Sequence, residues 1–430
     1  MDDYAADRSA APPVRARSPV PHGGDLRIAI ERFGGPAERW IDLSTGINPH
    51  GYPVPAIDAQ AWLRLPDDRD GLAELAASYY GAQRALPVAG SQPVIRLLPD
   101  LLPRCSDAHA TSRADAVGIA TLTYGEYAPA FVRAGHRVLR YGIADRQSSG
   151  FDSSPSLSRS SRLGTNTSQH QNQKINPADF IVYPGSVLPP ELLHLVVVNP
   201  NNPTAEQFDA ATLLGWHAQL ASRGGCLIVD EAFADVAPHA SVAAHSAVAG
   251  LIVLRSIGKF FGLAGARAGF TLAEPAVLDA LAAELGPWTL TGPTRAAVRA
   301  ALQDQAWQRT TRAHLHEAGE RLAALLTRRG LAPRSTPLFA WAPHCAAAAL
   351  HTRLASAAIW VRLFQDSAAG KTTAFESKLK SNSTKPSNER DSILPAYPSG
   401  LRFGLPGAES EWDRLDAALA GCSDLIDAGR

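Results

Sequence analysis

Short apolar runs alternate with helical patterns through the middle of this chain, and this alternation constrains the fold more than any other feature. The runs are nearly unbroken, so strands made from them would be buried on both faces. They occur at residues 85–89, 116–120, 137–140, 193–198, 226–229 and 251–254. Helical patterns such as "PVIRLLPDLL" and "AATLLGWHAQLASRG" separate most of them. The sequence therefore predicts an α/β fold with a mostly parallel sheet covered by helices.

The pattern changes after residue 290. One long helix is predicted from Pro293 to Gly330, followed by short β-like segments and a last helix. With 430 residues, the chain is longer than one compact core usually holds. We therefore expect a large domain over residues 56–290 and a smaller C-terminal α+β domain over residues 291–430. Residues 21–55 would precede them as an N-terminal arm.

Two stretches and the N-terminus differ from the rest of the chain in composition. Residues 146–176 and 365–392 are rich in Ser, Asn, Gln, Lys and Thr and poor in large apolar residues. Such stretches cannot bury enough apolar surface to offset the entropy of ordering them. We expect both to be low-complexity surface insertions. The first 20 residues lack the apolar core of a secretion signal, and we expect them to form a disordered tail.

Overall composition argues against several classes of protein. The formal net charge is +0, so no global field favours nucleic acid or an anionic membrane. The four cysteines are widely separated and form no CxxC pair, which argues against a metal or disulfide framework. No apolar run approaches the roughly 18 residues that span a bilayer. We expect a cytoplasmic protein without a metal site and without nucleic-acid or membrane partners.

Polar residues follow five of the predicted strands. In open α/β sheets, ligands bind beyond the carboxyl ends of the strands, so these residues would share one site. They are Gly90-Ser91-Gln92, Thr123-Tyr124, the "NPNNPT" segment at 199–204, Asp230-Glu231, and Ser256 with Lys259.

Each of these features has an ordinary structural explanation when it is taken alone. Gly90-Ser91-Gln92 suits a helix N-terminus, and "NPNNPT" suits a turn. Tyr124 could be a packed surface aromatic, and Asp230 a cap or an ion-pair partner. Lys259 could be a solvated charge, because lysine is seldom buried unpaired. Their common position at five strand ends is what favours a single site.

The combination matches the chemical needs of pyridoxal phosphate. Its phosphate needs backbone N–H groups at a helix N-terminus, a hydroxyl and a basic side chain. Its ring nitrogen needs a carboxylate, its ring face an aromatic side chain and its ring oxygen an amide donor. Its aldehyde needs an amine with which to form a Schiff base. The five strand ends supply these groups apart from the basic side chain, for which Arg267 stands eight residues after Lys259.

The motifs "NPNNPT", "VDEAF" and "SIGKFFGLAGARAGF" resemble those of the fold-type-I pyridoxal-phosphate enzymes, the aspartate-aminotransferase superfamily. This resemblance implies a seven-stranded, mostly parallel sheet in the large domain and a homodimer with sites at the subunit interface. It assigns the catalytic Schiff-base amine to Lys259, the ring-nitrogen carboxylate to Asp230, the ring-oxygen donor to Asn202 and the stacked ring to Tyr124. It assigns the phosphate site to Gly90, Ser91, Gln92, Ser256 and Arg267, and the substrate-carboxylate site to Arg402.

Two N-terminal segments narrow the resemblance. "HGGDL" at 22–26 and "IDLSTGINPHGYP" at 41–53 are similar to the threonine-phosphate decarboxylases of cobalamin biosynthesis, in which the arm folds over the active site. By this resemblance His22 contacts the substrate and Arg362 binds its phosphate. Gly46 stands where some of these enzymes have an asparagine that touches the substrate, so any contact there would come from the backbone. The implied reaction converts L-threonine O-3-phosphate to (R)-1-amino-2-propanol O-2-phosphate.

Two alternatives remain open at this point. A histidinol-phosphate-type aminotransferase shares the same cofactor apparatus. Phe233 favours the decarboxylase, because aminotransferases of this group usually carry a tyrosine three residues after the aspartate, and decarboxylases tend to carry phenylalanine. The second alternative is a non-catalytic protein that kept the fold, and the full set of cofactor residues argues against it.

Overall fold

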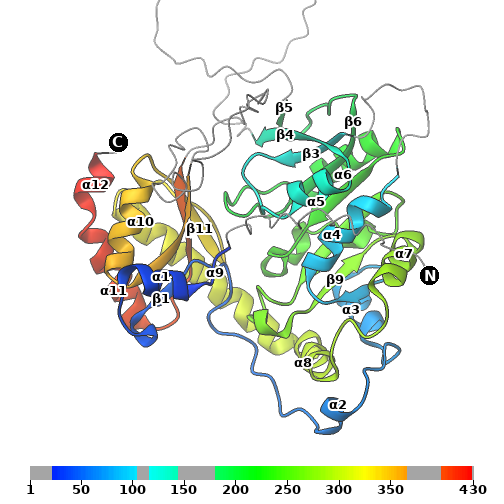
Figure 1. Ribbon diagram of the computed structural model, residues 1–430, viewed down its shortest axis with the longest axis horizontal. Helices are drawn as coiled ribbons and strands as arrows, with labels where there is room; N and C mark the ends of the chain where they lie inside the picture. Colours follow the sequence, from blue (N-terminus) through cyan, green and yellow to red (C-terminus); the bar gives the residue numbers. More distant parts are fainter. Residues whose placement is uncertain (1–21, 104–115, 144–179, 366–398, 429–430) are drawn as a thin grey trace, which may run out of the picture.

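The structure is a computed structural model that describes residues 22–103, 116–143, 180–365 and 399–428. The predicted 1–20 tail, the 146–176 insertion and, apart from Gln365, the 365–392 insertion lie outside these ranges. The described chain forms two sheets with helices around them (Figure 1). None of its helices is both long and apolar enough to cross a membrane.

The large sheet contains the strands that the apolar runs predict. Its order is β2 (Leu86–Val88), β9 (Gly269–Leu272), β8 (Leu251–Ser256), β7 (Cys226–Asp230), β6 (Leu192–Val198), β3 (Ala116–Ala120), β4 (Arg137–Ile143) and β5 (Phe180–Val182). β9 is antiparallel to both of its neighbours, and the other pairs are parallel. The mostly parallel sheet is confirmed, but it has eight described strands rather than seven. The apolar runs did not predict β9 or β5, and β5 pairs only three residues with β4 at the sheet edge.

Both faces of this sheet are buried, which explains the unbroken apolar runs. Along β6, Leu195 and Val197 join one core while Val196 and Val198 join the other. The first core also takes residues of α3 (Leu72–Tyr80) and α6 (Ala210–Ala221). The second takes residues of α4 (Ser91–Leu101), α5 (Tyr127–Arg133) and α7 (Pro275–Leu285). Because side chains alternate between two helical layers, the strand interiors are mostly apolar, and His194 of β6 and Thr271 of β9 are buried polar exceptions.

The second sheet is smaller and mixed. Its order is β1 (Ile41–Leu43), β12 (Ile359–Phe364), β13 (Gly400–Gly404), β11 (Phe339–Pro343) and β10 (Arg334–Thr336). The helices associated with it are α1 (Leu26–Phe33), α10 (Ala347–Ser356), α11 (Glu409–Ala420) and α12 (Ser423–Asp427). β1 pairs in parallel with β12, and α1 packs on α10 through a small apolar cluster. The N-terminal arm is therefore built into the smaller sheet. The division into domains at residue 290 stays a prediction.

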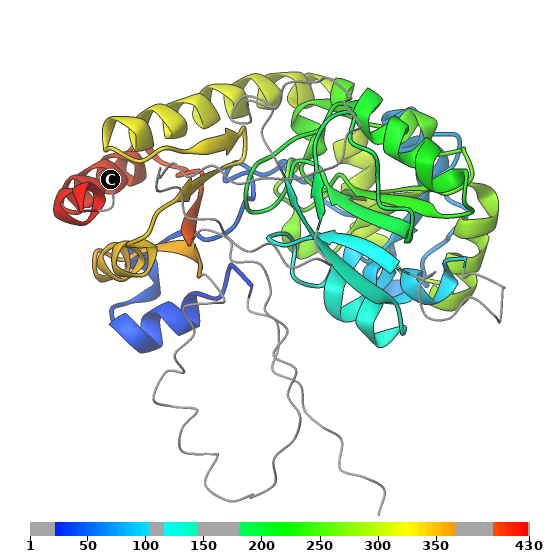
Figure 2. The same cartoon turned by 90° about the horizontal axis from the view of Figure 1, so that it is seen from above.

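The long helix expected from Pro293 to Gly330 is in fact two helices. α8 (Gly292–Gln303) ends at Asp304, and α9 (Gln305–Arg328) begins directly after it. The Asp304 side chain accepts a hydrogen bond from the Trp307 N–H at 2.9 Å, which caps the new helix. Figure 2 shows α9 running from the large sheet to the smaller one. Short elements complete the described chain: α2 (Gln60–Leu63) and 3₁₀ turns at Ala37–Arg39, Ala234–Val236, Pro238–Ala240, Ala243–His245 and Ala264–Ala266.

A buried arginine joins β8 to the loop after β7. Arg255 is 1% exposed and donates to Glu231 at 2.5 Å and to Asp235 at 2.6 Å. Burial alone would lower the pKa of Arg255, but the carboxylates of Asp235 and Glu231 outweigh it and raise the pKa. The guanidinium also lies 4.5 Å from the centre of the Tyr80 ring.

We expect Arg255→Met to cost about 3–5 kcal/mol of unfolding free energy, because it leaves two buried carboxylates without their partner. Urea unfolding at neutral pH measures this loss. Arg84→Met is the matched control, since Arg84 pairs with Asp279 at the surface and its loss should cost less than about 1 kcal/mol. Equal losses in the two variants would contradict the assignment of the Arg255 network as the stabilising one.

Candidate active site

The order of strands in the large sheet reverses between β6 and β3. Loops after these two strands leave toward opposite faces, and a crevice opens at such a point. Asn202 follows β6, while Thr123 and Tyr124 follow β3. Thr123 donates to Asn201 at 2.7 Å, so the two loops are held together at the reversal.

Two adjoining cavities occupy this edge of the sheet. The first, of about 120 Å³, has among its lining the nine residues predicted to bind the cofactor: Gly90, Ser91, Gln92, Tyr124, Asn202, Asp230, Ser256, Lys259 and Arg267. The second, of about 200 Å³, is lined by the four predicted substrate residues, His22, Gly46, Arg362 and Arg402. Tyr124, Asn202 and Lys259 line both cavities. The structure thus brings together every residue predicted to bind the cofactor or the substrate, while their roles stay predictions.

Asp230 ends β7 with its carboxylate buried. Tyr127 donates its hydroxyl to Oδ2 at 2.7 Å, and the Ala232 N–H donates to Oδ1 at 3.0 Å. Burial raises the pKa of Asp230, while these donors and the charge of Lys259 oppose the rise. Asp230 also lines the first cavity, so a carboxylate with two fixed donors faces the space available to a ligand.

Lys259 follows β8 and sits between several charges. Burial lowers its pKa to about 8, Arg402 and Arg267 add to the decrease, and Asp230 opposes it. Its Nζ lies 5.4 Å from the centre of the Phe233 ring. A lysine with this pKa has a substantial fraction of neutral, nucleophilic amine at neutral to mildly alkaline pH.

The N-terminal arm braces the loop that carries Lys259. The Asn48 backbone N–H donates to the Lys259 carbonyl at 3.0 Å, and its side chain donates to the Phe260 carbonyl at 2.9 Å. Gly262 has φ +68°, and a Cβ there would lie 2.5 Å from the Gly51 Cα. The small residues around Lys259 therefore allow two backbones to touch. Sequence analysis did not identify Asn48.

The start of α4 has the features of an anion site. No side chain caps this helix, which leaves first-turn N–H groups beside the first cavity. Gly90 has φ +78°, and a Cβ there would lie 3.0 Å from Nη2 of Arg267. Arg267 itself adopts φ 49°, a left-handed conformation that is uncommon for arginine. A helix N-terminus, a guanidinium and the Ser256 hydroxyl fit the phosphate of pyridoxal phosphate.

Arg362 and Arg402 lie directly opposite each other on β12 and β13. Burial and then the charge of Arg362 lower the pKa of Arg402 to about 9. Arg402 donates to Asn202 Oδ1 and to the Ser44 carbonyl, and its Nε has no partner among the described residues. Two like charges paired across strands destabilise a sheet. A ligand with two anionic groups would relieve that cost.

His22 is held at the second cavity by a chain of hydrogen bonds. Its Nε2 lies 2.8 Å from Glu126 Oε1, and Glu126 Oε2 accepts from the Gln92 side chain at 2.6 Å. Gln92 in turn accepts from the Tyr124 hydroxyl at 3.0 Å. Burial, Asp230 and Glu126 raise the pKa of Tyr124 to about 12, so it keeps its proton. The sequence placed Gln92 at the phosphate site but did not predict its side-chain contacts with Tyr124 and Glu126, and Glu126 was missed.

Gly46 and Phe233 shape the wall beside Lys259. A Cβ on Gly46 would lie 2.9 Å from Phe233 Cε1 and 3.1 Å from Phe339 Cδ1. A larger residue, including the asparagine of some related enzymes, would displace these rings. Phe233 is buried and has no hydroxyl to donate toward a ligand in the first cavity.

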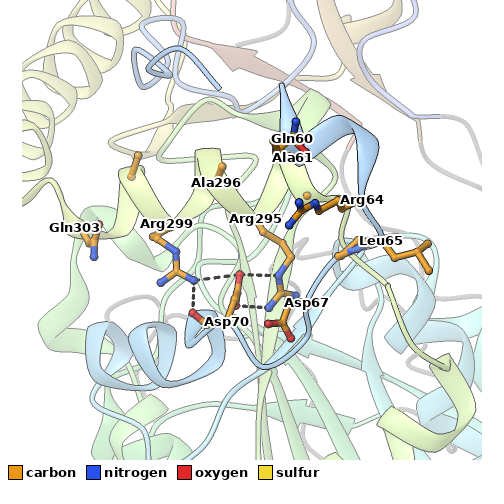
Figure 3. A pocket seen from close by; sticks show the side chains of 13 residues that line it. Gln60, Ala61, Arg64, Leu65, Asp67, Asp70, Arg295, Ala296, Arg299 and Gln303 are labelled. Carbon is orange, nitrogen blue, oxygen red and sulfur yellow. Dashed lines mark hydrogen bonds and ion pairs between the residues drawn. The ribbon is translucent and has the colours of Figure 1, made fainter. Parts of the chain in front are cut away.

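A third cavity, of about 630 Å³, lies between α2 and α8, away from these residues. Figure 3 shows Arg295 and Arg299 turned toward Asp70. Arg295 donates to both carboxylate oxygens of Asp70, and Arg299 donates to the Asp70 carbonyl. These ion pairs lower the pKa of Asp70 to about 2, against the effect of its partial burial. The charges in this cavity compensate one another.

Comparisons with known proteins agree with this geometry. The profile described as aminotransferase class I and II matches residues 69–368. The threonine-phosphate decarboxylase of Pseudomonas aeruginosa is 41% identical over 93% of this chain and 97% of its own length. A Sinorhizobium threonine-phosphate decarboxylase is 39% identical over 81% of this chain and 90% of its own length.

A solved structure extends the likeness to the fold. The histidinol-phosphate aminotransferase of Clostridium acetobutylicum has a TM-score of 0.61 at 15% identity, over 89% of this chain and 98% of that one. The resemblance to threonine-phosphate decarboxylases and the fold-type-I architecture expected from the motifs are confirmed. The chain belongs to the class I and II aminotransferase family.

Proposed function

We propose that this chain is a pyridoxal-phosphate-dependent decarboxylase of L-threonine O-3-phosphate that acts in cobalamin biosynthesis. The observation that carries the proposal is the pair of opposed arginines, Arg362 and Arg402, in a cavity that adjoins Lys259. The substrate has two anionic groups, a carboxylate and a phosphate, which match two guanidinium groups. The names of the two long, similar relatives support the same substrate.

The residues of the first cavity would hold the cofactor. The α4 N-terminus, Ser256 and Arg267 take its phosphate, Asp230 its ring nitrogen, Asn202 its ring oxygen and Lys259 its aldehyde. Tyr124 covers the ring face. When bound, pyridoxal phosphate supplies a conjugated ring that accepts the electron pair of the broken bond.

The residues of the second cavity would choose which bond breaks. Arg402 holds the substrate carboxylate, while Arg362 and His22 hold its phosphate. Anchoring at both ends fixes the rotation of the substrate, so the bond to the carboxylate is the one aligned for cleavage. The carboxylate leaves as carbon dioxide. Lys259 then delivers a proton to the same carbon in place of the lost carboxylate, which yields (R)-1-amino-2-propanol O-2-phosphate.

We further propose that the chain acts in the cytoplasm as a homodimer. Trp62, Leu63 and Leu65, in and just after α2, are 69%, 76% and 69% exposed, and Trp288 is 52% exposed. Large apolar side chains gathered at a surface favour burial against another chain. A second copy is the partner expected in this family, and the mass of the protein in solution tests it.

Two assays distinguish the proposed decarboxylation from transamination. With threonine phosphate, the purified holoenzyme should release carbon dioxide at a rate that saturates with substrate. With histidinol phosphate and 2-oxoglutarate, it should form no glutamate. Lys259→Ala is the control and should release neither product. Glutamate without carbon dioxide would show an aminotransferase instead.

Arg362→Ala should raise KM for threonine phosphate by about tenfold to a hundredfold, as expected for the loss of a hydrogen bond between charged groups. The reason is that the phosphate would lose its guanidinium while Arg402 still binds the carboxylate. Steady-state carbon dioxide release measures the change. Arg362→Lys keeps the charge and should recover part of the loss. Any slow turnover of unphosphorylated threonine should be unaffected, and an equal loss with both substrates would contradict the assignment.

A further inference from the structure

Tyr127 occupies a position between two residues proposed to bind the cofactor. It begins α5, three residues after Tyr124, and is 1% exposed. Its ring meets that of Tyr124 edge-on, with centroids 6.3 Å apart. On its other side, its hydroxyl lies 2.7 Å from Asp230 Oδ2. Neither the motifs nor the proposed function gives this residue a role.

The direction of the Tyr127–Asp230 hydrogen bond is determined by its surroundings. Burial and the nearby Asp230 carboxylate raise the pKa of Tyr127 far above its ordinary value. Tyr127 therefore keeps its proton and donates, and Asp230 accepts. A buried carboxylate is costly unless donors stabilise its charge, and here the two short donors are Tyr127 and the Ala232 N–H.

This donation affects where a shared proton would reside. A ring nitrogen facing Asp230 and the carboxylate compete for one proton. Each donor on the carboxylate stabilises its ionised form and lowers its proton affinity, which leaves the proton on the ring nitrogen. Tyr127 also fixes the rotation of the carboxylate, because each of its oxygens then has one fixed partner.

We propose that Tyr127 is a positioning residue that keeps Asp230 ionised and oriented, so that the cofactor ring nitrogen stays protonated. This inference rests on the proposed function only for the identity of the cofactor and for the role of Asp230. It does not depend on which substrate bond is broken.

The test compares Tyr127→Phe with Tyr141→Phe. Tyr141, on β4 of the large sheet, is also 1% exposed, and its hydroxyl donates to the Val196 carbonyl at 2.9 Å, away from Asp230. Both variants lose one buried hydroxyl. Each holoenzyme is loaded with pyridoxal phosphate labelled with ¹⁵N in the ring, and the ¹⁵N resonance is recorded together with kcat and KM.

In Tyr127→Phe, we expect the ¹⁵N resonance to move toward that of an unprotonated ring. We expect kcat to fall by about tenfold or more, with KM for threonine phosphate nearly unchanged, because the lost hydrogen bond involves a charged group. In Tyr141→Phe, the resonance should not move, whatever the change in stability. A Tyr127→Phe resonance identical to that of the wild type would overturn the inference.

A second variant covers the case in which Tyr127→Phe does not fold. Incorporation of 3-fluorotyrosine at position 127 keeps the hydroxyl and makes it a stronger donor, so the ring nitrogen should lose its proton at a higher pH than in the wild type, as followed by the ¹⁵N resonance in a pH titration. An unchanged midpoint of that titration would again contradict the proposal. A wild-type protein that binds the cofactor with a protonated ring but releases no carbon dioxide would refute the proposed function alone.

Discussion

The ion pairs of Arg255 with Glu231 and Asp235 hold together the part of the large sheet on which the site depends. Arg255 directly precedes Ser256, and Glu231 directly follows Asp230. The pairs therefore tie the end of β8 to the end of β7, the two strand ends that carry Lys259 and Asp230. An apolar core could stabilise these strands equally well, but it would not specify their relative register so narrowly. These buried ion pairs lie at the carboxyl ends of β7 and β8, next to the residues of the first cavity, where directional contacts fix the position of the backbone.

The candidate site brings together cationic side chains that repel one another, which costs folding free energy. Lys259, Arg362 and Arg402 all line one cavity. Burial lowers the pKa of Lys259 and of Arg402, and the charge of Arg402 adds to the decrease at Lys259 while that of Arg362 adds to it at Arg402. Such repulsion persists only where the surrounding structure holds the groups in place and a ligand compensates the charge. The cavity between α2 and α8 shows the opposite case, because Asp68 and Asp70 there form ion pairs with Arg295 and Arg299.

Much of the fold and of the candidate site could be predicted from the sequence, because the information was local. Unbroken apolar runs gave the buried strands, and the residues just after them line the two cavities. The contacts of Asn48, Glu126 and Tyr127 could not be predicted, since their partners lie 212, 104 and 103 residues away. The break at Asp304 did have a local signal, because aspartate before a helical pattern is a typical N-cap. The three-residue strand β5 had no such local sequence signal.

The two sheets contribute different parts of the proposed chemistry. Lys259 and Asp230 come from the large sheet, whereas Arg362 and Arg402 come from the smaller one. The contact between Arg402 and Asn202 joins the two sheets at the site, and the arm residue Asn48 joins the arm to the Lys259 loop. In the proposed mechanism, the choice between decarboxylation and transamination is a choice of substrate rotation, which the anion sites would control. The proposed function therefore assigns that choice to the smaller sheet and the arm, and the apparatus that both reactions share to the large sheet.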